Sequence, residues 1–562
     1  MVEHVLAKDE TRVRFSLAAH ISKVEQDTKN LISKIPKEVS HVTDTLEKAG
    51  FEAYLVGGCV RDLIMDIEPK DWDITTNAKP EQIIGLFEKT VYENTFGTVG
   101  VVIRETLEGD VSHGTSTIEV TPYRIETKYT DFRHPDEVQF SDKIEDDLKR
   151  RDFTVNALAM DSKGHTTDLF GGIKDIKNKT LKAVGSPDDR FSEDALRMLR
   201  AVRFACQLNF SVSYETMESI LKNADLIKKI SEERIRDEFA KIIMSQNPAS
   251  GIVMLQKFNL LKNIIPELEE GMGCEQLGEH IYDVWEHLLH AVQHAADKNW
   301  PLEIRLAALF HDIGKPRSRR LASADAFSQV LGSPVQNFKN ERAQPDHSKK
   351  HTSSAKKKFT FYGHEVVGAR MAKKIMERLK FSKKETELVE KLVRNHMFFS
   401  DTELITLSAV RRIITKVGIG NIWLLMNVRE CDRVGMKKKE APYRLRKYFA
   451  MIEEALRDPI SVGQLKIDGE FMMKELGIKP GPRMGWILHA LLEEILDAPE
   501  KNTVEHLSEL VRSLNMLGDA ELRTLGERGK EKKEELEEEE IEKLHAKHGV
   551  RSGKGPDRKA RA

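Results

Sequence analysis

The fold of this chain is decided by residues 54–76, YLVGGCVRDLIMDIEPKDWDITT, in which an apolar run is followed by two glycines, a short helical pattern and two aspartates. The run AYLVGG has the length and residue bias of a buried strand, and terminal glycines let backbone N–H groups approach a ligand closely. A helix predicted over CVRDLIM offers unpaired N–H groups at its start, and Arg61 adds a planar donor fork. Gly57, Gly58 and Arg61 therefore predict a site for triphosphate oxygens.

A second predicted strand, DWDIT, carries Asp71 and Asp73. Side chains two residues apart on a strand point to one face, where two carboxylates can share hard cations about 4 Å apart. Paired glycines are common in turns and a DxD pair is common in solvated loops, so neither alone indicates a site. Their joint occurrence predicts Mg²⁺-dependent nucleotidyl transfer with Asp71 and Asp73 as catalytic metal ligands. The segment contains neither a GxGxxG nor a GxxxxGK[ST] motif, which excludes a dinucleotide-binding fold and a P-loop kinase.

Further segments follow this one in an order that resembles the tRNA nucleotidyltransferase and poly(A) polymerase family, in its bacterial class. They are TDFRHPDEVQF (130–140), LKRRDFTVNALAMD (148–161), DLFGGIKDI (168–176), RFSEDALRMLRAVRFACQLNF (190–210) and EERIRDEF (232–239). The resemblance covers about residues 50–245 and implies an α+β fold, in which a small mixed-sheet nucleotidyltransferase head precedes largely helical regions.

The segment LKRRDFTVN contains a donor-rich cluster of Arg150, Arg151, Asp152 and Asn156. These groups suit phosphates and ribose hydroxyls. The resemblance implies that RRD contacts the sugar of the nucleotide, and the alternative is a solvated basic helix start.

Glu119 lies on an alternating strand pattern, STIEVTPYR, expected to join the same sheet. We expect it to be a third catalytic carboxylate that supports the metals. A strand glutamate that faces solvent is the alternative.

The segment EDALRMLRAVR predicts a helix with Glu193, Arg197 and Arg200 on one face and Asp194 three residues before Arg197. Cytosine and adenine present an amino donor beside a ring-nitrogen acceptor, so one carboxylate and one guanidinium accept C and A and reject U and G. Asp194 and Arg197 fit that template. The resemblance implies that this helix reads the incoming base, with Arg200 and Arg203 lining the site; an intrahelical salt-bridge ladder is the alternative.

The loop YTDFRHP, residues 129–135, resembles the mobile loop with which the family switches from C to A addition. Asp131 and Arg133 therefore favour complete CCA addition, or A addition beside a separate CC-adding enzyme.

A second constellation follows the order H…HD…H…H…D of an HD-type phosphohydrolase. Imidazoles and carboxylates suit Mn, Fe, Ni or Zn, and adjacent His and Asp can bind one metal while bridging to a second. The helices that carry them would have to converge, and a histidine on an apolar helix is otherwise often a core residue. The resemblance implies 2′,3′-cyclic phosphodiesterase and phosphatase activity for trimming damaged tRNA ends. The predicted ligands are His287, His311, Asp312, His364, His396 and Asp432.

Composition sets the remaining bounds. The chain has 562 residues, 40% of them hydrophobic, and a formal net charge of −2, so RNA binding has to come from local basic patches. Its four cysteines include no CxxC pair, and no apolar run approaches the roughly 18 residues of a membrane helix. We expect a soluble, cytoplasmic protein with no membrane partner; the sequence leaves its oligomeric state open.

Composition shifts divide the chain into six expected regions. They are a charged helical extension (1–35), the nucleotidyltransferase head (36–160), a helical neck that binds RNA and base (161–250), an HD-type metal-binding helical domain (251–455) with a mobile insertion (317–358), a helical tRNA-binding tail (456–525) and a charged helix with a basic disordered tail (526–562).

These observations favour an enzyme that adds CCA to tRNA 3′ ends from CTP and ATP and releases pyrophosphate, with an HD-domain phosphohydrolase activity for end repair. Two alternatives remain within the enzyme class, a poly(A) polymerase and an A-adding enzyme. A metal-dependent phosphohydrolase with an RNA-binding head is the alternative from another class, and a noncatalytic RNA-binding scaffold is a further one.

Overall fold

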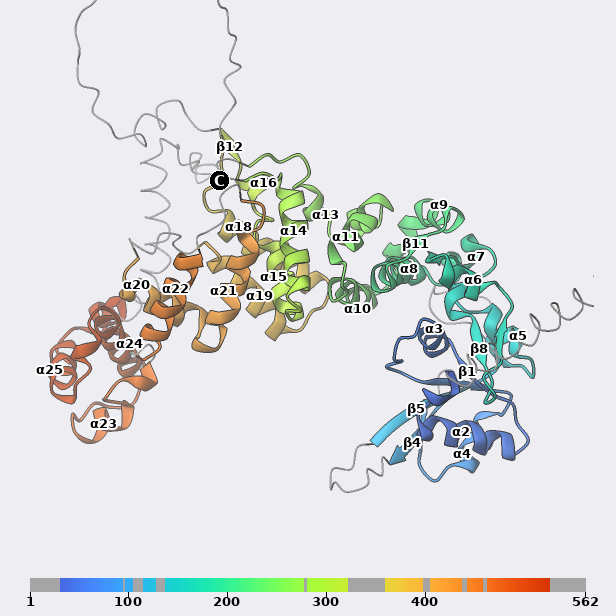
Figure 1. Cartoon of the computed structure of the whole chain (residues 1–562). Coiled ribbons are helices and arrows are strands. Elements are labelled where there is room, and N and C mark those ends of the chain that lie inside the picture. Colours follow the sequence, from blue (N-terminus) through green and yellow to red (C-terminus); the bar gives the residue numbers. More distant parts are fainter. Residues whose placement is uncertain are drawn as a thin grey trace, which may run out of the picture. The chain divides into compact units, whose positions relative to one another are not determined.

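The computed structural model describes nine stretches of the chain. They are residues 31–93, 97–104, 115–127, 137–276, 280–321, 359–397, 405–436, 442–457 and 462–525. The chain forms two compact units, Met1–Ile264 and Ile265–Ala562 (Figure 1). Residues 1–30 of the expected extension (1–35), most of the insertion (317–358) and the region after 525 lie outside the described residues.

A seven-stranded mixed sheet forms the head of the first unit, with the strand order β3-β4-β5-β2-β1-β8-β9. Strands β2 and β5 are parallel, and the other neighbours are antiparallel. The bounds are β1 Ala53–Val56, β2 Asp73–Thr76, β3 Thr90–Glu93, β4 Thr98–Arg104, β5 Thr115–Pro122, β8 Leu158–Met160 and β9 Thr166–Asp168; a separate pair comprises β6 Arg124–Thr127 and β7 Glu137–Phe140. The prediction of an α+β fold with a small mixed-sheet head is confirmed.

Helices accompany this sheet and then replace it along the first unit. Their bounds are α2 Lys37–Lys48, α3 Gly58–Ile64, α4 Pro80–Leu86, α5 Ile144–Lys149, α6 Gly172–Lys177, α7 Pro187–Glu193, α8 Leu196–Leu208, α9 Tyr214–Asn223, α10 Glu232–Ile243, α11 Pro248–Lys257 and α12 Leu261–Ile264; a two-stranded pair joins β10 Thr180–Leu181 to β11 Ser211–Val212. Part of the head core consists of Val56, Tyr123, Ile144, Leu148 and Ala159. Burial of such apolar side chains between sheet and helices is the main stabilising contribution.

The predicted strand, glycine turn and helix are present as β1, Gly57 and α3. The second prediction was partly wrong, because β2 begins at Asp73 and Asp71 lies in a bend before it. Strand alternation therefore fixes the direction of Asp73 but not that of Asp71. The boundary expected at residue 160 falls between β8 and β9 of one sheet.

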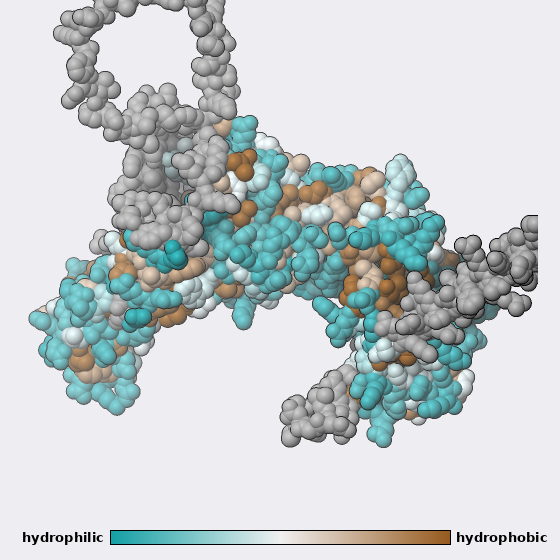
Figure 2. Space-filling view, in the orientation of Figure 1, coloured by the Kyte–Doolittle hydropathy of each residue, from teal (hydrophilic) through white to brown (hydrophobic). Residues whose placement is uncertain are grey.

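The second unit is helical. Its helices are α13 Pro266–Glu269, α14 Val284–Asp297, α15 Leu302–Phe310, α16 Lys315–Ser318, α18 His364–Arg378, α19 Lys383–Asn395, α20 Leu407–Val417, α21 Ile422–Asp432, α22 Pro442–Ala455, α23 Gly469–Lys474, α24 Pro482–Asp497 and α25 Val504–Asn515. Helix α15 is buried along its length from Ile304 to Phe310 and packs against α14, α19 and α21. It is therefore the central helix of this bundle. The visible surface over α14 and α15 is mainly hydrophilic (Figure 2).

Two short strands, β12 Arg320–Leu321 and β13 Phe359–Thr360, pair antiparallel between α16 and α18. They hold the two ends of the segment 322–358 beside each other. Toward the C-terminus, α23, α24 and α25 enclose a separate apolar core that includes Met472, Ile487, Leu491 and Val511. Within the described residues, no helix combines the length and apolar character that a membrane crossing requires.

Candidate functional site

The glycine turn of the head touches the RRD segment. Gly57 has φ +83°, and a Cβ atom placed on it would lie 2.7 Å from Nη1 of Arg151. Only glycine adopts this conformation freely and permits this close approach. The guanidinium of Arg151 therefore covers the turn that was predicted to bind triphosphate.

Polar contacts continue from this turn toward the neck. Arg61 Nη1 donates to Asn156 Oδ1 at 2.6 Å, and Asn156 Nδ2 donates to Asp152 Oδ1 at 3.3 Å. Arg200 Nε donates to the other oxygen, Asp152 Oδ2, at 2.7 Å. Burial raises the pKa of Asp152, but Arg200 and Arg197 outweigh it and the pKa falls to about 2. The chain of contacts thus joins α3, the RRD segment and α8 around one buried carboxylate.

A second buried carboxylate organises the two neighbouring arginines. Asp147 accepts hydrogen bonds from Arg150 Nη2 at 2.6 Å and from Arg151 Nη2 at 3.1 Å. Burial raises the pKa of Asp147, but the two guanidinium groups produce a net lowering. Asp147 orients both arginines, and sequence reasoning did not identify it, because an acid three or four residues before arginines looks like an ordinary helix pair.

Asp73 and Glu119 are register partners on the parallel strands β2 and β5. Asp73 is half-buried, whereas Asp71 and Glu119 are exposed. Burial raises the pKa of Asp73 and Asp71 adds to this effect, while Arg151 opposes it. Carboxylate oxygens are the ligands that Mg²⁺ prefers, so the donor set fits the predicted cation. The three carboxylates are not drawn into a tight cluster: among the described residues, the groups with ligand atoms within 4.8 Å lie in the second unit.

The predicted base-reading helix is interrupted, which corrects the expectation of one continuous helix. Helix α7 ends at Glu193, and Asp194 has extended backbone angles, φ −139° and ψ 104°. Arg197 Nη1 donates to Glu193 Oε2 at 2.6 Å, and Asp194 Oδ2 accepts from Arg234 Nη2 at 2.7 Å. Asp194 and Arg197 are therefore each held by a separate partner. Of the salt-bridge ladder that was the alternative interpretation, the i,i+4 pair of Glu193 and Arg197 is present.

Arg203 is buried in an ion pair, with Nη1 at 2.8 Å from Glu238 Oε1. Burial lowers the pKa of Arg203, and the nearby positive charge of Arg200 adds to this, so the value falls to about 10. Three guanidinium carbons surround the ring of Phe204, those of Arg61, Arg200 and Arg203, at 5.5, 5.3 and 4.2 Å from its centroid. Arg200, Arg203 and Phe204 belong to α8, so cation–π attraction of this kind ties Arg61 of α3 to that helix. Asp131 and Arg133, predicted to act in a mobile loop, lie outside the described residues.

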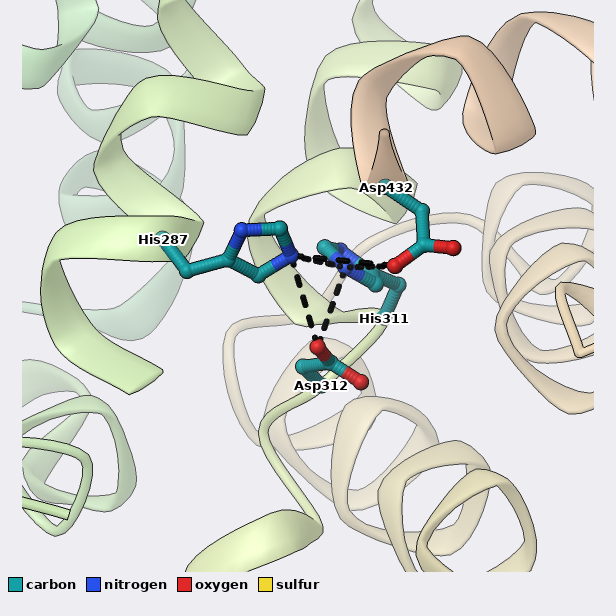
Figure 3. A group of neighbouring side chains, drawn as sticks. All are labelled: His287, His311, Asp312 and Asp432. Atoms are coloured by element: carbon teal, nitrogen blue, oxygen red, sulfur yellow. Dashed lines mark hydrogen bonds and ion pairs between the residues drawn. The ribbon is translucent and has the colours of Figure 1, made fainter. Parts of the chain in front are cut away.

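In the second unit the six predicted HD residues converge from the ends and faces of separate helices. His287 lies in α14, His311 and Asp312 follow α15, and Asp432 ends α21 (Figure 3). Nε2 of His287 lies 3.0 Å from Nε2 of His311 and 3.4 Å from Oδ2 of Asp312. Asp432 Oδ1 lies 3.5 Å from Nε2 of His311.

Asp312 reaches a second group of histidines through its other carboxylate oxygen, Oδ1. Asp312 Oδ1 lies 3.2 Å from Nε2 of His364 and 3.6 Å from Nε2 of His396. Within the described residues these three atoms are buried and have no hydrogen-bond partner. The ligand atoms within each group lie within 4.8 Å of one another. The arrangement gives two adjacent groups that share Asp312.

Backbone contacts orient three of these rings. Nδ1 of His311, His364 and His396 lies 2.6–2.7 Å from the carbonyl oxygen three residues earlier, on Ala308, Phe361 and Val393. An Nδ1–H that donates to a carbonyl leaves Nε2 directed at the cluster, which is the arrangement found in metal-binding histidines.

Buried imidazole and carboxylate groups, with three ligand atoms that have no hydrogen-bond partner among the described residues, fit a transition metal. Burial lowers the pKa of His287 and His396. Burial also lowers the pKa of His311, but Asp312 and Asp432 outweigh it and raise the value to about 10. The pKa of Asp312 lies well below its usual range, because Lys315 and His311 outweigh the effect of burial. Among the described residues, these two groups are possible metal-binding clusters.

Comparison with known families finds a match in three parts of the chain. Residues 53–182 match the family model described as "Poly A polymerase head domain". This part of the chain is similar to that family. Residues 209–272 match "Probable RNA and SrmB- binding site of polymerase A", and residues 278–439 match the HD domain.

Curated proteins that are similar to this chain include CCA-adding enzymes of lactobacilli. The protein of Ligilactobacillus salivarius is 47% identical over 226 residues, which are 40% of this chain and 54% of the relative. That of Lactobacillus helveticus is 50% identical over 202 residues, 36% of this chain and 48% of the relative. The chain thus spans about half the length of the curated relatives that it matches.

A solved structure of Bacillus stearothermophilus CCA-adding enzyme in complex with CTP is similar over most of its length. It has 25% sequence identity and a TM-score of 0.59, and the match covers 85% of this chain and 97% of that protein. The mixed-sheet head followed by helices is therefore the fold of that enzyme.

Several residues that organise the head and its neck were missed at the sequence level. Asp147, Arg234 and Glu238 each hold a predicted site arginine or aspartate. Arg234 and Glu238 fall within EERIRDEF, a segment that the sequence indicated but to which it assigned no contact. Partners 35 to 40 residues apart are set by helix packing, which local spacing does not reveal.

Proposed function

We propose that this protein is a template-independent nucleotidyltransferase that adds CCA to tRNA 3′ ends from CTP and ATP, with release of pyrophosphate. The observation that carries the proposal is the position of Arg151. Its guanidinium covers the Gly57 turn, and its positive charge acts to lower the pKa of Asp73. One group thus links the predicted triphosphate turn to the predicted metal-binding strand. The names of the curated relatives and of the CTP complex support the same activity.

Within this proposal, Gly57, Gly58 and Arg61 hold the triphosphate, and Arg150 and Arg151 contact phosphate and ribose oxygens. Asp71, Asp73 and Glu119 hold Mg²⁺, whose role when bound is to lower the barrier to displacement at the α-phosphorus and to stabilise pyrophosphate. The register pairing of Asp73 with Glu119 supports the third carboxylate. The 3′ hydroxyl of tRNA is the attacking group.

Selection of the base is assigned to Asp194 and Arg197. Arg197 is held by Glu193 and by the carbonyl of Arg150, and Asp194 is held by Arg234. A carboxylate and a guanidinium held by separate partners can keep a fixed spacing, which selectivity for C and A over U and G requires. Arg200 and Arg203 support this site through Asp152 and Glu238. Asp131 and Arg133 are proposed to act in switching from C to A.

A second activity, metal-dependent phosphohydrolysis in the HD domain, is favoured by the buried partnerless atoms of Asp312, His364 and His396. The ligands are proposed to hold Mn, Fe, Ni or Zn, with Asp312 shared between two positions. A metal in such a cluster would activate water toward a phosphate ester, as required for trimming damaged tRNA ends.

The deciding experiment incubates the purified protein and Mg²⁺ with a tRNA transcript that ends at the discriminator base. CTP, ATP or both are supplied and the products are sized. We expect two added residues with CTP and a third when ATP is also present. A long ladder with ATP alone would instead identify a poly(A) polymerase. An A-adding enzyme would add no C to this transcript and would add a single A to a second transcript that ends in CC.

If no extension occurs, we would conclude that the HD cluster carries the main function and that the head is an RNA-binding module. That outcome is tested separately with a 2′,3′-cyclic phosphate RNA end and Mn²⁺. A noncatalytic scaffold would show neither activity, and its CTP binding would not require Mg²⁺.

A further inference from the structure

Lys315 places a positive charge directly against the HD cluster. It is the first residue of α16 and is 7% exposed. Its Nζ donates to Asp312 Oδ2 at 2.5 Å and to Gln276 Oε1 at 2.6 Å. The ammonium therefore contacts the aspartate that both ligand groups share.

Gln276 is fixed in the orientation that holds this lysine. Its Nε2 donates to the carbonyl oxygens of Tyr282 and Asp283 at 3.3 and 3.4 Å. With the amide nitrogen so engaged, Oε1 is left to accept from Lys315. The lysine is thus held at the cluster by two partners, one of which is not a predicted metal ligand.

The two oxygens of Asp312 have different surroundings. Oδ2 faces His287 and His311 and already accepts the ammonium of Lys315. Oδ1 faces His364 and His396 and, within the described part of the chain, has no hydrogen-bond partner. A dication at Oδ2 would meet the positive charge of Lys315 at short range, whereas Oδ1 accepts no such hydrogen bond from the described residues.

We propose that Lys315 is the internal cation of the HD cluster: it competes with the metal for Oδ2 of Asp312 and, once displaced, binds the phosphate of the substrate. Gln276 keeps the displaced ammonium beside the cluster. With one N–H of Lys315 donated to Gln276, the other two would be available to a phosphate held at the cluster. The phosphate step rests on the proposed hydrolase function, whereas the competition for Oδ2 does not.

In the first test, the metal-free protein is titrated with Mn²⁺ and binding is measured by calorimetry. Groups just outside a metal's ligands change its affinity by about 10- to 100-fold. We expect Lys315→Met to strengthen binding at one position about tenfold, because the competitor is gone. Lys315→Arg keeps the charge and should bind Mn²⁺ like the native protein. Lys373→Met is the matched control, because Lys373 pairs with Glu390 away from the cluster.

Unchanged or weaker Mn²⁺ binding by Lys315→Met would overturn the competition, provided that its circular dichroism matches that of Lys315→Arg and so shows a folded chain. This result does not depend on any hydrolysis, so failure of the hydrolase proposal and failure of this inference are distinguishable.

The second test titrates the Mn²⁺-loaded proteins with inorganic phosphate. We expect phosphate affinity to fall about tenfold in Lys315→Met, the loss of one charge-assisted contact, and to be retained in Lys373→Met. Equal phosphate affinity in all forms would remove the phosphate-binding role and leave only the competition with metal.

Discussion

Asp73 and Glu119 face each other across the parallel pairing of β2 and β5, which places a half-buried and an exposed carboxylate side by side at the centre of the head sheet. Their positions follow from strand register, so both carboxylates are carried by rigid elements. Asp71, by contrast, precedes the strand. The pair on the sheet is therefore the fixed part of the proposed magnesium site.

Replacing Asp73 with Asn should reduce incorporation of both CTP and ATP by about 100- to 1,000-fold, because metal stabilisation of transition-state charge is worth several kcal/mol. Asp71→Asn should do the same. Initial rates of primer extension measure the effect. Asp66→Asn is the control, since it removes an exposed charge in the same segment. Native rates in Asp73→Asn would place the metal elsewhere.

Glu119→Gln should leave the fold intact and raise the Mg²⁺ concentration needed for half-maximal extension, because one ligand charge is removed beside Asp73. The measurement is extension rate against Mg²⁺ concentration. An unchanged Mg²⁺ dependence would assign Glu119 to the solvent-facing alternative.

Asp194→Asn should lower the use of CTP and ATP and raise the relative use of UTP and GTP, because the acceptor for the exocyclic amino group is weakened. One well-placed hydrogen-bond pair accounts for about 1–3 kcal/mol of discrimination, so selectivity should fall at least about fivefold. Single-turnover rates for the four nucleotides measure it. The control is Asp225→Asn, which removes an exposed acid of the neck. Preserved selectivity in Asp194→Asn would argue against base reading by this residue.

Asp152 should contribute pH-dependent stability. Its pKa of about 2 in the folded protein lies below the ordinary value of 3.8. A carboxyl group whose pKa is lower in the folded than in the unfolded state stabilises the fold at pH values above its unfolded pKa. This stabilisation is lost as the pH falls through the folded pKa, so the contribution of about 2 kcal/mol should disappear between about pH 5 and pH 2. The expected result is that Asp152→Asn is less stable than the native protein at pH 7 and that the difference shrinks toward pH 2. Denaturant unfolding at several pH values measures it, and a difference independent of pH would contradict the ion-pair explanation.

The two HD groups predict metal content directly. His396→Ala should remove one group and leave the other, whereas Asp312→Ala should disrupt both, because Asp312 is common to them. Elemental analysis after Mn²⁺ loading gives the metal per chain. Neither change should alter CTP or ATP incorporation, and a parallel loss of extension would show that the two activities are not independent.

The local pattern in residues 54–76 was sufficient to predict the strand, the glycine turn and α3, because each depends on neighbours in sequence. The convergence of the HD residues was also expected, and the structure brings them together. What local spacing did not reveal was long-range partnership. The EDxxR spacing looks like continuous helix, yet Asp194 leaves the helix and pairs with Arg234. Lys315 was likewise not singled out, because its contact with Gln276 depends on the fold of the bundle.

The pairing of Arg320–Leu321 with Phe359–Thr360 has an implication for how this chain tolerates change in length. The residues on either side of the segment 322–358 are paired, so the spacing between His311 and His364 in space is set by the helices and not by the number of residues between the strands. The entropy of closing a flexible loop grows only slowly with its length. Residues can therefore be inserted or deleted between β12 and β13 while the histidine geometry is preserved.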